Sequence, residues 1–141
     1  SKSTAGDWLA NSDRRIKTNI QNIYDAAGTV MKLRPVKFRY NSEYLEANPS
    51  IEDKTYYNFI AQEYREVFPE SVQGSGEYLE SGDEILQIDT YNAQVVTIKA
   101  VQELIEENKR LKERLDRVTE IVNELMSYHD NGLVPADRVA K

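Results

Sequence analysis

The sequence predicts an α+β fold: a small body of mixed helices and strands with long projecting loops, followed by a long C-terminal helix that forms a homotrimeric coiled coil. Three observations predict it. Short segments in the first ninety residues change between helical and strand-like spacing of apolar residues, neither Gly nor Pro occurs between Tyr91 and Gly132, and aliphatic residues recur in heptads within that stretch. The length of 141 residues suits one domain.

Residues 1–11 are small and polar around Trp8 and Leu9, and they are too few to form a domain. We expect them to be the end of an upstream structure that precedes the domain proper, which then covers residues 12–141.

Apolar residues at helical spacing follow Ser12 and Asp13, a pair of types that favours a helix start. This pattern predicts one helix over residues 13–33, with Gly28 as a weak point where it breaks. Pro35 ends it, because proline disfavours the helical conformation in the residue before it. The residues with this spacing are Ile16, Ile20, Ile23, Tyr24, Ala27, Val30, Met31 and Leu33.

Several short strands follow. Val36, Phe38 and Tyr40 alternate with polar residues, which is the pattern of a half-buried strand. Further strands are predicted at 57–61, 71–73 and 85–88, and a short helix at 62–68 that Pro69 closes.

Two polar insertions separate these elements. Residues 41–55 form a long loop that we expect to project from the body. Residues 74–84 begin with Gly74-Ser75-Gly76, which predicts a turn and a second flexible excursion.

The C-terminal helix is predicted over residues 91–128 and carries four heptads. Seven of its eight seam positions are aliphatic, and at about 25 cal/mol per Å² their burial favours association by several kcal/mol per strand. One seam position holds Val101, Asn108, Leu115 and Val122, and the other holds Leu104, Leu111, Val118 and Leu125.

A polar residue within the seam and the apolar residues beside it bear on the register and the number of strands. The amide of Asn108 needs a polar partner, so it sets the register of the strands. Ile105, Ile121 and Met126 widen the apolar stripe, which favours three strands slightly over two. The competing interpretation is an amphipathic helix folded against its own domain. The only other long helix predicted, over residues 13–33, is about half the length that such a partner would need.

Composition excludes several functions. The net charge is −6 and the pI is about 4.9, so we expect neither a nucleic-acid nor a membrane partner. Cysteine is absent and His129 is the single histidine, which leaves no imidazole cluster from which to build a metal site and predicts no cofactor. Catalysis therefore depends on hydroxyl, amine or carboxylate groups.

Ser12 and Lys17 place a hydroxyl and an amine five positions apart, directly after the leader. Alone, this signal is weak, because a Ser-Asp pair before a helix is usually an N-cap and Arg14 and Arg15 in a first turn are usually solvated.

Four segments of the sequence strengthen the case that Ser12 and Lys17 are catalytic. Residues 12–17 read Ser-Asp-Arg-Arg-Ile-Lys, residues 33–40 read Leu-Arg-Pro-Val-Lys-Phe-Arg-Tyr, residues 59–70 contain Phe-Ile-Ala-Gln-Glu and Val-Phe-Pro-Glu, and residues 98–104 read Ile-Lys-Ala-Val-Gln-Glu-Leu. Together and in this order they resemble the endosialidase-type intramolecular chaperone family over nearly all of residues 12–122. Ile16 stands where leucine is common in that family.

The resemblance implies a self-cleaving C-terminal module of phage tail fibres, tailspikes and neck appendages. Such a module, here residues 12–141, forms a homotrimer, helps the preceding β-rich stalk to fold and then releases itself. Carried over onto this sequence, Ser12 is the nucleophile, Lys17 is its partner, and the bond between Asn11 and Ser12 is cut, with Asp13, Arg14 and Arg15 in support. The module would act in the host cytoplasm during virion assembly and be absent from the mature virion after release.

The residue types suit that chemistry. Attack of the Ser12 hydroxyl on the Asn11 carbonyl passes through a five-membered ring, and the ester that results is then hydrolysed. Lys17 can take the hydroxyl proton and protonate the leaving amine only if it is neutral part of the time. Because a five-residue offset does not align side chains on a helix, we expect Ser12 to lie in a turn ahead of it, or Lys17 to come from another chain.

Two alternatives stay open. In the first, the chain is a non-catalytic trimerisation domain of a fibre protein, and Ser12 only caps a helix. In the second, the insertions form a receptor- or glycan-binding surface with Tyr44, Tyr56, Tyr57 and Tyr78 as contacts, although tyrosines near strands are more often packing residues.

Overall fold

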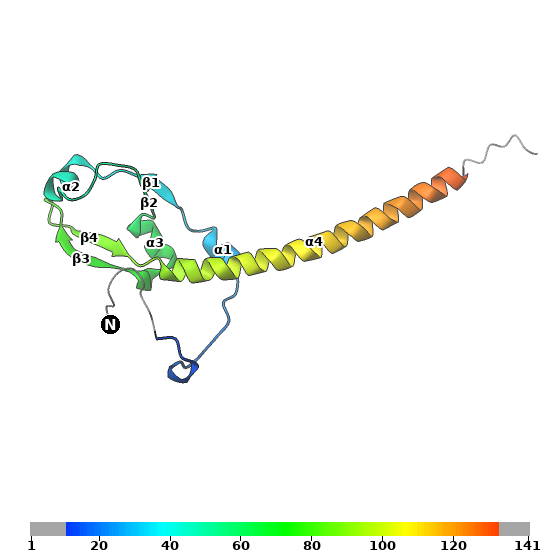
Figure 1. The fold of residues 1–141 in the computed structure, drawn as a ribbon, viewed down its shortest axis with the longest axis horizontal. Coiled ribbons are helices and arrows are strands. Elements are labelled where there is room, and N and C mark those ends of the chain that lie inside the picture. The colour runs from blue at the N-terminus through cyan, green and yellow to red at the C-terminus, as the bar shows by residue number, and fades with distance from the viewer. Residues whose placement is uncertain (1–10, 133–141) are drawn as a thin grey trace, which may run out of the picture.

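The structure, a computed structural model, describes residues 11–132. A small body of helices and strands lies at one end, and one long helix projects from it (Figure 1). The elements in chain order are η1 (Arg14–Ile16), α1 (Ala26–Val30), β1 (Val36–Phe38), α2 (Ser42–Ala47), β2 (Tyr56–Asn58), α3 (Ala61–Val67), η2 (Pro69–Ser71), β3 (Val72–Tyr78), β4 (Glu84–Ile88) and α4 (Tyr91–Gly132). Of the leader predicted over residues 1–11, residues 1–10 lie outside the described range.

The single helix predicted over residues 13–33 is wrong. The segment forms the 3₁₀ turn η1, an extended stretch and the short helix α1, and Asn19 and Asp25 have φ angles of +50° and +51°. These left-handed residues cannot continue an α-helix. Ile16 and Ile20 are 62% and 57% exposed, so nothing in residues 11–132 covers this first half of the apolar stripe, and a helix without packing is marginal in water. Gly28 lies within α1 rather than at a break.

The first pair of strands confirms the alternation around Val36 in shorter form. β1 pairs antiparallel with β2, with Val36 opposite Asn58 and Phe38 opposite Tyr56. The rings of Phe38 and Tyr56 lie 6.0 Å apart, and the ring of Tyr40 meets both of them at 5.2 and 5.3 Å. Cross-strand aromatic pairs of this kind stabilise a two-stranded sheet that has few hydrogen bonds of its own.

The insertion at residues 41–55 is not wholly a loop, because it contains α2. The side chain of Asn41 caps this helix by accepting a hydrogen bond from the Tyr44 amide at 2.8 Å. The Tyr44 ring then packs 4.8 Å from that of Tyr40. α2 is short, so an apolar period was too brief to reveal it, but the Asn-Ser-Glu start was a usable signal.

The turn predicted at Gly74-Ser75-Gly76 is also wrong. β3 continues through these residues to Tyr78 and pairs antiparallel with β4, with an irregular register between Gly74 and Tyr78. The chain reverses at residues 79–83 instead, where the Leu79 amide donates to the Asp83 carbonyl at 2.9 Å. Gly82 supplies the positive φ that this reversal requires, at +88°.

The core lies where α1 and α3 meet the first turns of α4. Tyr64 of α3 is 1% exposed, and its hydroxyl donates to the Asp89 carbonyl at 3.2 Å. Its ring packs between those of Phe59 and Phe68, at 5.1 and 5.5 Å. The predicted helix at 62–68 and its stop at Pro69 are therefore confirmed. The buried apolar residues are Ala26, Tyr64, Phe68, Ala93, Val96 and Ala100.

The long C-terminal helix is confirmed as α4, whose 42 residues span about 63 Å at 1.5 Å per residue. Ala93, Val96 and Ala100 bury its first part against the body, whereas nearly every residue from Val101 to Gly132 is exposed. The helix therefore does not fold back on its own domain. Within residues 11–132, no helix has the length and apolarity needed to cross a membrane.

Candidate functional site

Ser12 and Lys17 lie in contact. The Nζ atom of Lys17 donates a hydrogen bond to the Ser12 Oγ atom at 2.6 Å. The 3₁₀ turn η1 between them makes this contact, because Lys17 ends the turn in an extended conformation and its side chain can reach back past the turn. The expected arrangement, with the serine in a turn instead of on a straight helix, is present within one chain.

Asp13 shapes this turn. Its side chain accepts a hydrogen bond from the Arg15 amide at 2.8 Å, so Asp13 is the N-cap of η1 and Ser12 is not. The Arg15 guanidinium also binds the Asp13 carboxylate, with its Nη2 atom 2.6 Å from Oδ2. These hydrogen bonds from Arg15 lower the pKa of the Asp13 carboxyl below its usual value, so Asp13 is ionised at neutral pH.

Arg14 holds the other end of the turn. Its Nη1 atom donates to the carbonyl oxygen of Lys17 at 3.2 Å, next to the backbone bond from the Lys17 amide to the Arg14 carbonyl at 3.3 Å. All three supporting residues predicted from the sequence therefore belong to one local turn. Asp13 and Arg15 close its start, and Arg14 closes its end.

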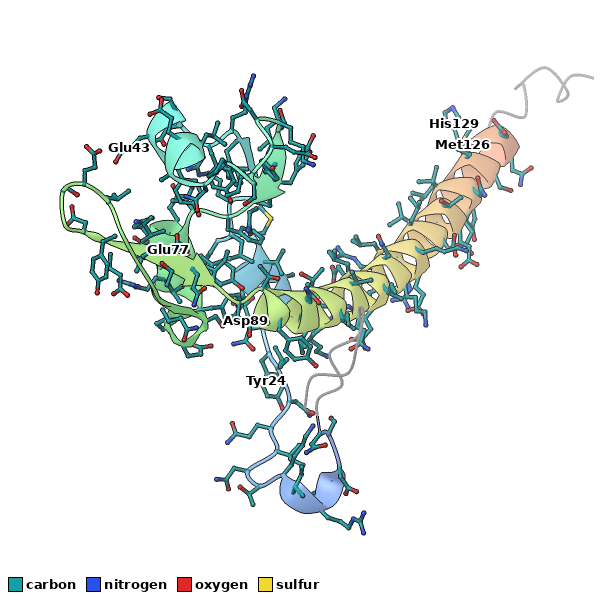
Figure 2. All side chains as sticks on the ribbon, turned by 60° about the vertical axis from the view of Figure 1, so that its left-hand side comes forward. Tyr24, Glu43, Glu77, Asp89, Met126 and His129 are labelled. Atoms are coloured by element: carbon teal, nitrogen blue, oxygen red, sulfur yellow. The ribbon has the colours of Figure 1, made fainter. Side chains whose placement is uncertain are left out.

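The segment that carries this turn is exposed. Every residue from Asn11 to Asp25 is exposed in the single chain, and Tyr24, at the point where the segment meets the body, is 79% exposed. Figure 2 shows residues 11–25 as an arm that hangs away from the body, with Tyr24 near its attachment. We call residues 11–25 the arm. No other part of the described chain shields its reactive pair from water.

Glu103 of α4 holds the start of α1, the helix that follows the arm. Its carboxylate accepts hydrogen bonds from the amides of Ala27 at 2.9 Å and Ala26 at 3.1 Å, the first residues of α1. The residue before them, Asp25, makes no side-chain cap, so Glu103 supplies the cap from a helix distant in sequence. The two amides, Ala27 first, lower the pKa of Glu103. Sequence reasoning missed this residue, because no local pattern links positions 77 residues apart.

The seam residues predicted from the heptads all lie on α4. Val101, Leu104, Leu111, Leu115, Val118, Val122 and Leu125 are 46–65% exposed, and Asn108 is exposed as well. Their three- and four-residue spacing puts them on one side of the helix. The single chain thus leaves a continuous aliphatic stripe in water.

The four tyrosines of the alternative binding surface divide into two kinds. Tyr44 and Tyr56 pack within the aromatic cluster beside Tyr40, which is the structural role expected near strands. Tyr57 and Tyr78 are 79% and 65% exposed. They lie on different strands, β2 and β3, which belong to separate sheets.

An open apolar groove of about 960 Å³ lies between the β1–β2 hairpin and the start of α4. Val36, Tyr57, Phe59 and Ala93 contribute to its walls, and none of its lining residues comes from the arm. Within residues 11–132 of one chain, no cluster of three or more His, Cys, Asp or Glu side chains could hold a metal ion.

Comparison with known proteins agrees with the resemblance for three of the four motif segments, and the fourth, residues 98–104, lies beyond the matched region. The family model described as chaperone of endosialidase matches residues 12–73, and the family's name also classes it among peptidases. No curated protein matches the chain significantly. The match begins at Ser12 and includes the arm, β1, β2 and α3, whereas β4 and α4 follow it. The match over residues 12–73 thus supports an endosialidase-type intramolecular chaperone domain in this part of the chain.

Proposed function

We propose that the chain is a C-terminal intramolecular chaperone that trimerises, assists folding of a preceding β-rich phage fibre or spike stalk, and releases itself by autoproteolysis between Asn11 and Ser12. The observation that carries the proposal is the 2.6 Å contact between the Lys17 Nζ and Ser12 Oγ atoms, at the first residue of the matched family region.

The proposed chemistry begins at this contact. In its charged form Lys17 donates to Ser12 Oγ, and in its neutral form the same amine accepts the hydroxyl proton. The Ser12 Oγ atom forms a bond to the Asn11 carbonyl carbon, and the proton passes from Lys17 to the Ser12 backbone nitrogen as the carbon–nitrogen bond breaks. Water then hydrolyses the ester, which leaves a carboxylate on Asn11 and restores the Ser12 hydroxyl.

The exposed stripe on α4 supports the trimer. Its aliphatic residues, together with Ile105, Ile121 and Met126 at 49–60% exposure, form an apolar face wider than a two-stranded seam needs. Burying such a face yields about 25 cal/mol per Å² removed from water. Association of three copies through α4 is the arrangement that covers most of it.

The position of the arm suggests how assembly would control cleavage. In one chain the Ser12–Lys17 pair is exposed, while α1, which follows the arm directly, is held on α4 by Glu103. Assembly of α4 would bring neighbouring chains beside the arms, exclude water and complete the site. Cleavage would then release only correctly assembled stalks. Without the chaperone, the stalk could not refold along the same route, so its persistence would be kinetic.

The proposal also implies where the chain acts and with which partners. The chain would act in the host cytoplasm during virion assembly, with two further copies and its own stalk as partners, and would leave before the virion matures.

A non-catalytic trimerisation domain is the second candidate. The exposure of both Ser12 and Lys17 in the single chain favours it, because an exposed amine and hydroxyl form many contacts without catalysis. However, this candidate treated Ser12 as a helix cap, and Asp13 holds that role instead. The Ser12 hydroxyl is therefore left without the structural duty that would explain it.

The test is intact-mass measurement of the chain carrying its upstream stalk. We expect a released piece that begins at Ser12 and has 130 residues (141 − 11). Ser12→Ala and Lys17→Ala should each abolish it, whereas Thr18→Ala, which removes an exposed hydroxyl next to the pair, should not. Cleavage that survives both substitutions would overturn the dyad, and a wild-type chain that assembles but is never cut would establish the non-catalytic alternative.

A further inference from the structure

The heptad register of α4 continues beyond its last aliphatic residues. Val101, Asn108, Leu115 and Val122 occupy one seam position, and seven residues after Val122 the same position holds His129. α4 extends to Gly132, so this position still lies within the helix. The single histidine of the sequence therefore falls on the seam.

The structure places His129 on the apolar side of α4. His129 lines an open recess of about 250 Å³ together with Val122, Leu125, Met126 and Asp130. Val122 and Leu125 are themselves seam residues, so the imidazole shares their side of the helix. Figure 2 shows Met126 and His129 close together near the far end of α4, away from the body.

We infer that three copies of His129 form a binding site for one divalent transition metal ion, such as zinc, on the axis of the assembled coil. This inference rests on the proposed homotrimer. A threefold axis turns one histidine per chain into three imidazoles that face each other. Three histidine nitrogens with a water in the fourth position are an established donor set for zinc, at about 2.0–2.1 Å.

The chemistry of the surroundings favours a cation. Inside a seam, three imidazoles would bury polar nitrogens without partners, which is costly, and a metal ion satisfies one nitrogen of each. Asp130 lines the same recess and adds a carboxylate per chain beside the site. The carboxyl end of a helix also attracts positive charge, and His129 lies in the last turn of α4.

Zinc binding should be measured on the untagged full chain after chelator treatment, by equilibrium dialysis at neutral pH. Sedimentation with and without zinc should accompany it, with three times 16.2 kDa as the mark of a trimer. We expect about one zinc ion per three chains, and substitution of zinc by cobalt should give the absorption bands of a tetrahedral site. Zinc should also lower the protein concentration at which the trimer dissociates.

The variant His129→Leu should lose the zinc and keep the trimer, because leucine suits a seam position. In that background Asn108→His moves the imidazoles three heptads (21 residues) toward the body, and it should restore one ion per trimer if the register is right.

The outcomes separate the inference from the proposed trimer. A trimer that binds no zinc, or that binds it equally after His129→Leu, overturns the metal site and leaves the trimer standing. A monomer with and without zinc overturns both. If zinc converts the wild-type monomer to a trimer but leaves the His129→Leu variant monomeric, the metal site is supported as a contribution to assembly.

Discussion

Lys17 and Ser12 meet at 2.6 Å across a three-residue 3₁₀ turn, although five positions separate them in the sequence. The turn is closed by local contacts alone, namely the Asp13 cap on Arg15 and the Arg14 bond to the Lys17 carbonyl. The pair therefore forms within one chain. The described part of one chain supplies no cover over the pair.

Lys17→Arg tests whether the amine acts as a base. Arginine keeps the charge and the reach of lysine but does not lose its proton in proteins, so it cannot accept the Ser12 hydroxyl proton. We expect cleavage of the stalk-bearing chain to slow by at least about 100-fold, the lower range of general-base contributions. Time courses of intact mass measure this effect.

Lys32→Arg is the matched control for that substitution, because it makes the same exchange at an exposed position outside the arm. It should change cleavage little. Equal losses in both variants would show that the exchange acts through charge or bulk and not through proton transfer at Ser12.

Glu103 predicts a pH dependence of the contact between α1 and α4. Hydrogen bonds from the Ala27 and Ala26 amides lower its pKa in the folded chain. Its contribution to stability is therefore complete above the unfolded pKa of about 4.3, and it is lost as the pH falls through the lower, folded pKa. The protection of the Ala26 and Ala27 amides against hydrogen exchange, relative to their intrinsic rates at each pH, should fall over that acid range.

Glu103→Gln should remove this acid-dependent part of the exchange, because its amide side chain does not titrate. Glu106→Gln, on an exposed position one turn further along α4, should leave the pH profile unchanged. If the wild-type and Glu103→Gln profiles coincide, the carboxylate does not hold α1.

Phe68→Ala should destabilise the body by about 3–5 kcal/mol, since it removes a ring that is 8% exposed and stacked on Tyr64. Denaturant unfolding followed by tyrosine fluorescence measures the change. Tyr57→Ala removes a ring of similar size that is 79% exposed, and it should cost far less. A loss below about 1 kcal/mol for Phe68→Ala would contradict the assigned core.

Leu115→Asp should dissociate the proposed trimer, because it places three carboxylates in the middle of an apolar seam. Sedimentation velocity should show the lone chain. Ser127→Asp adds the same side chain on the outer face, at the heptad position opposite the seam, and should leave the trimer intact. Dissociation by both variants, or by neither, would argue against the heptad assignment.

Local patterns of the sequence predicted much of this protein. The absence of Gly and Pro and the heptads defined α4, Pro69 marked the end of α3, and period-two alternation located β1, whereas α1 ends at Val30, before the stop predicted at Pro35. The candidate dyad was also readable, because its residues are close in sequence and belong to a motif. These features depend on neighbouring residues, whose propensities act before any tertiary contact forms.

Tertiary structure decided the rest. The spacing around Ile16 and Ile20 was helical, but no surface within residues 11–132 covers it and the segment became an exposed arm. Glu103 caps α1 from 76 residues away, a contact that no window of sequence contains. The physical reason is the same in both cases: an amphipathic segment takes the conformation for which the fold offers a partner, and those partners are distant in sequence.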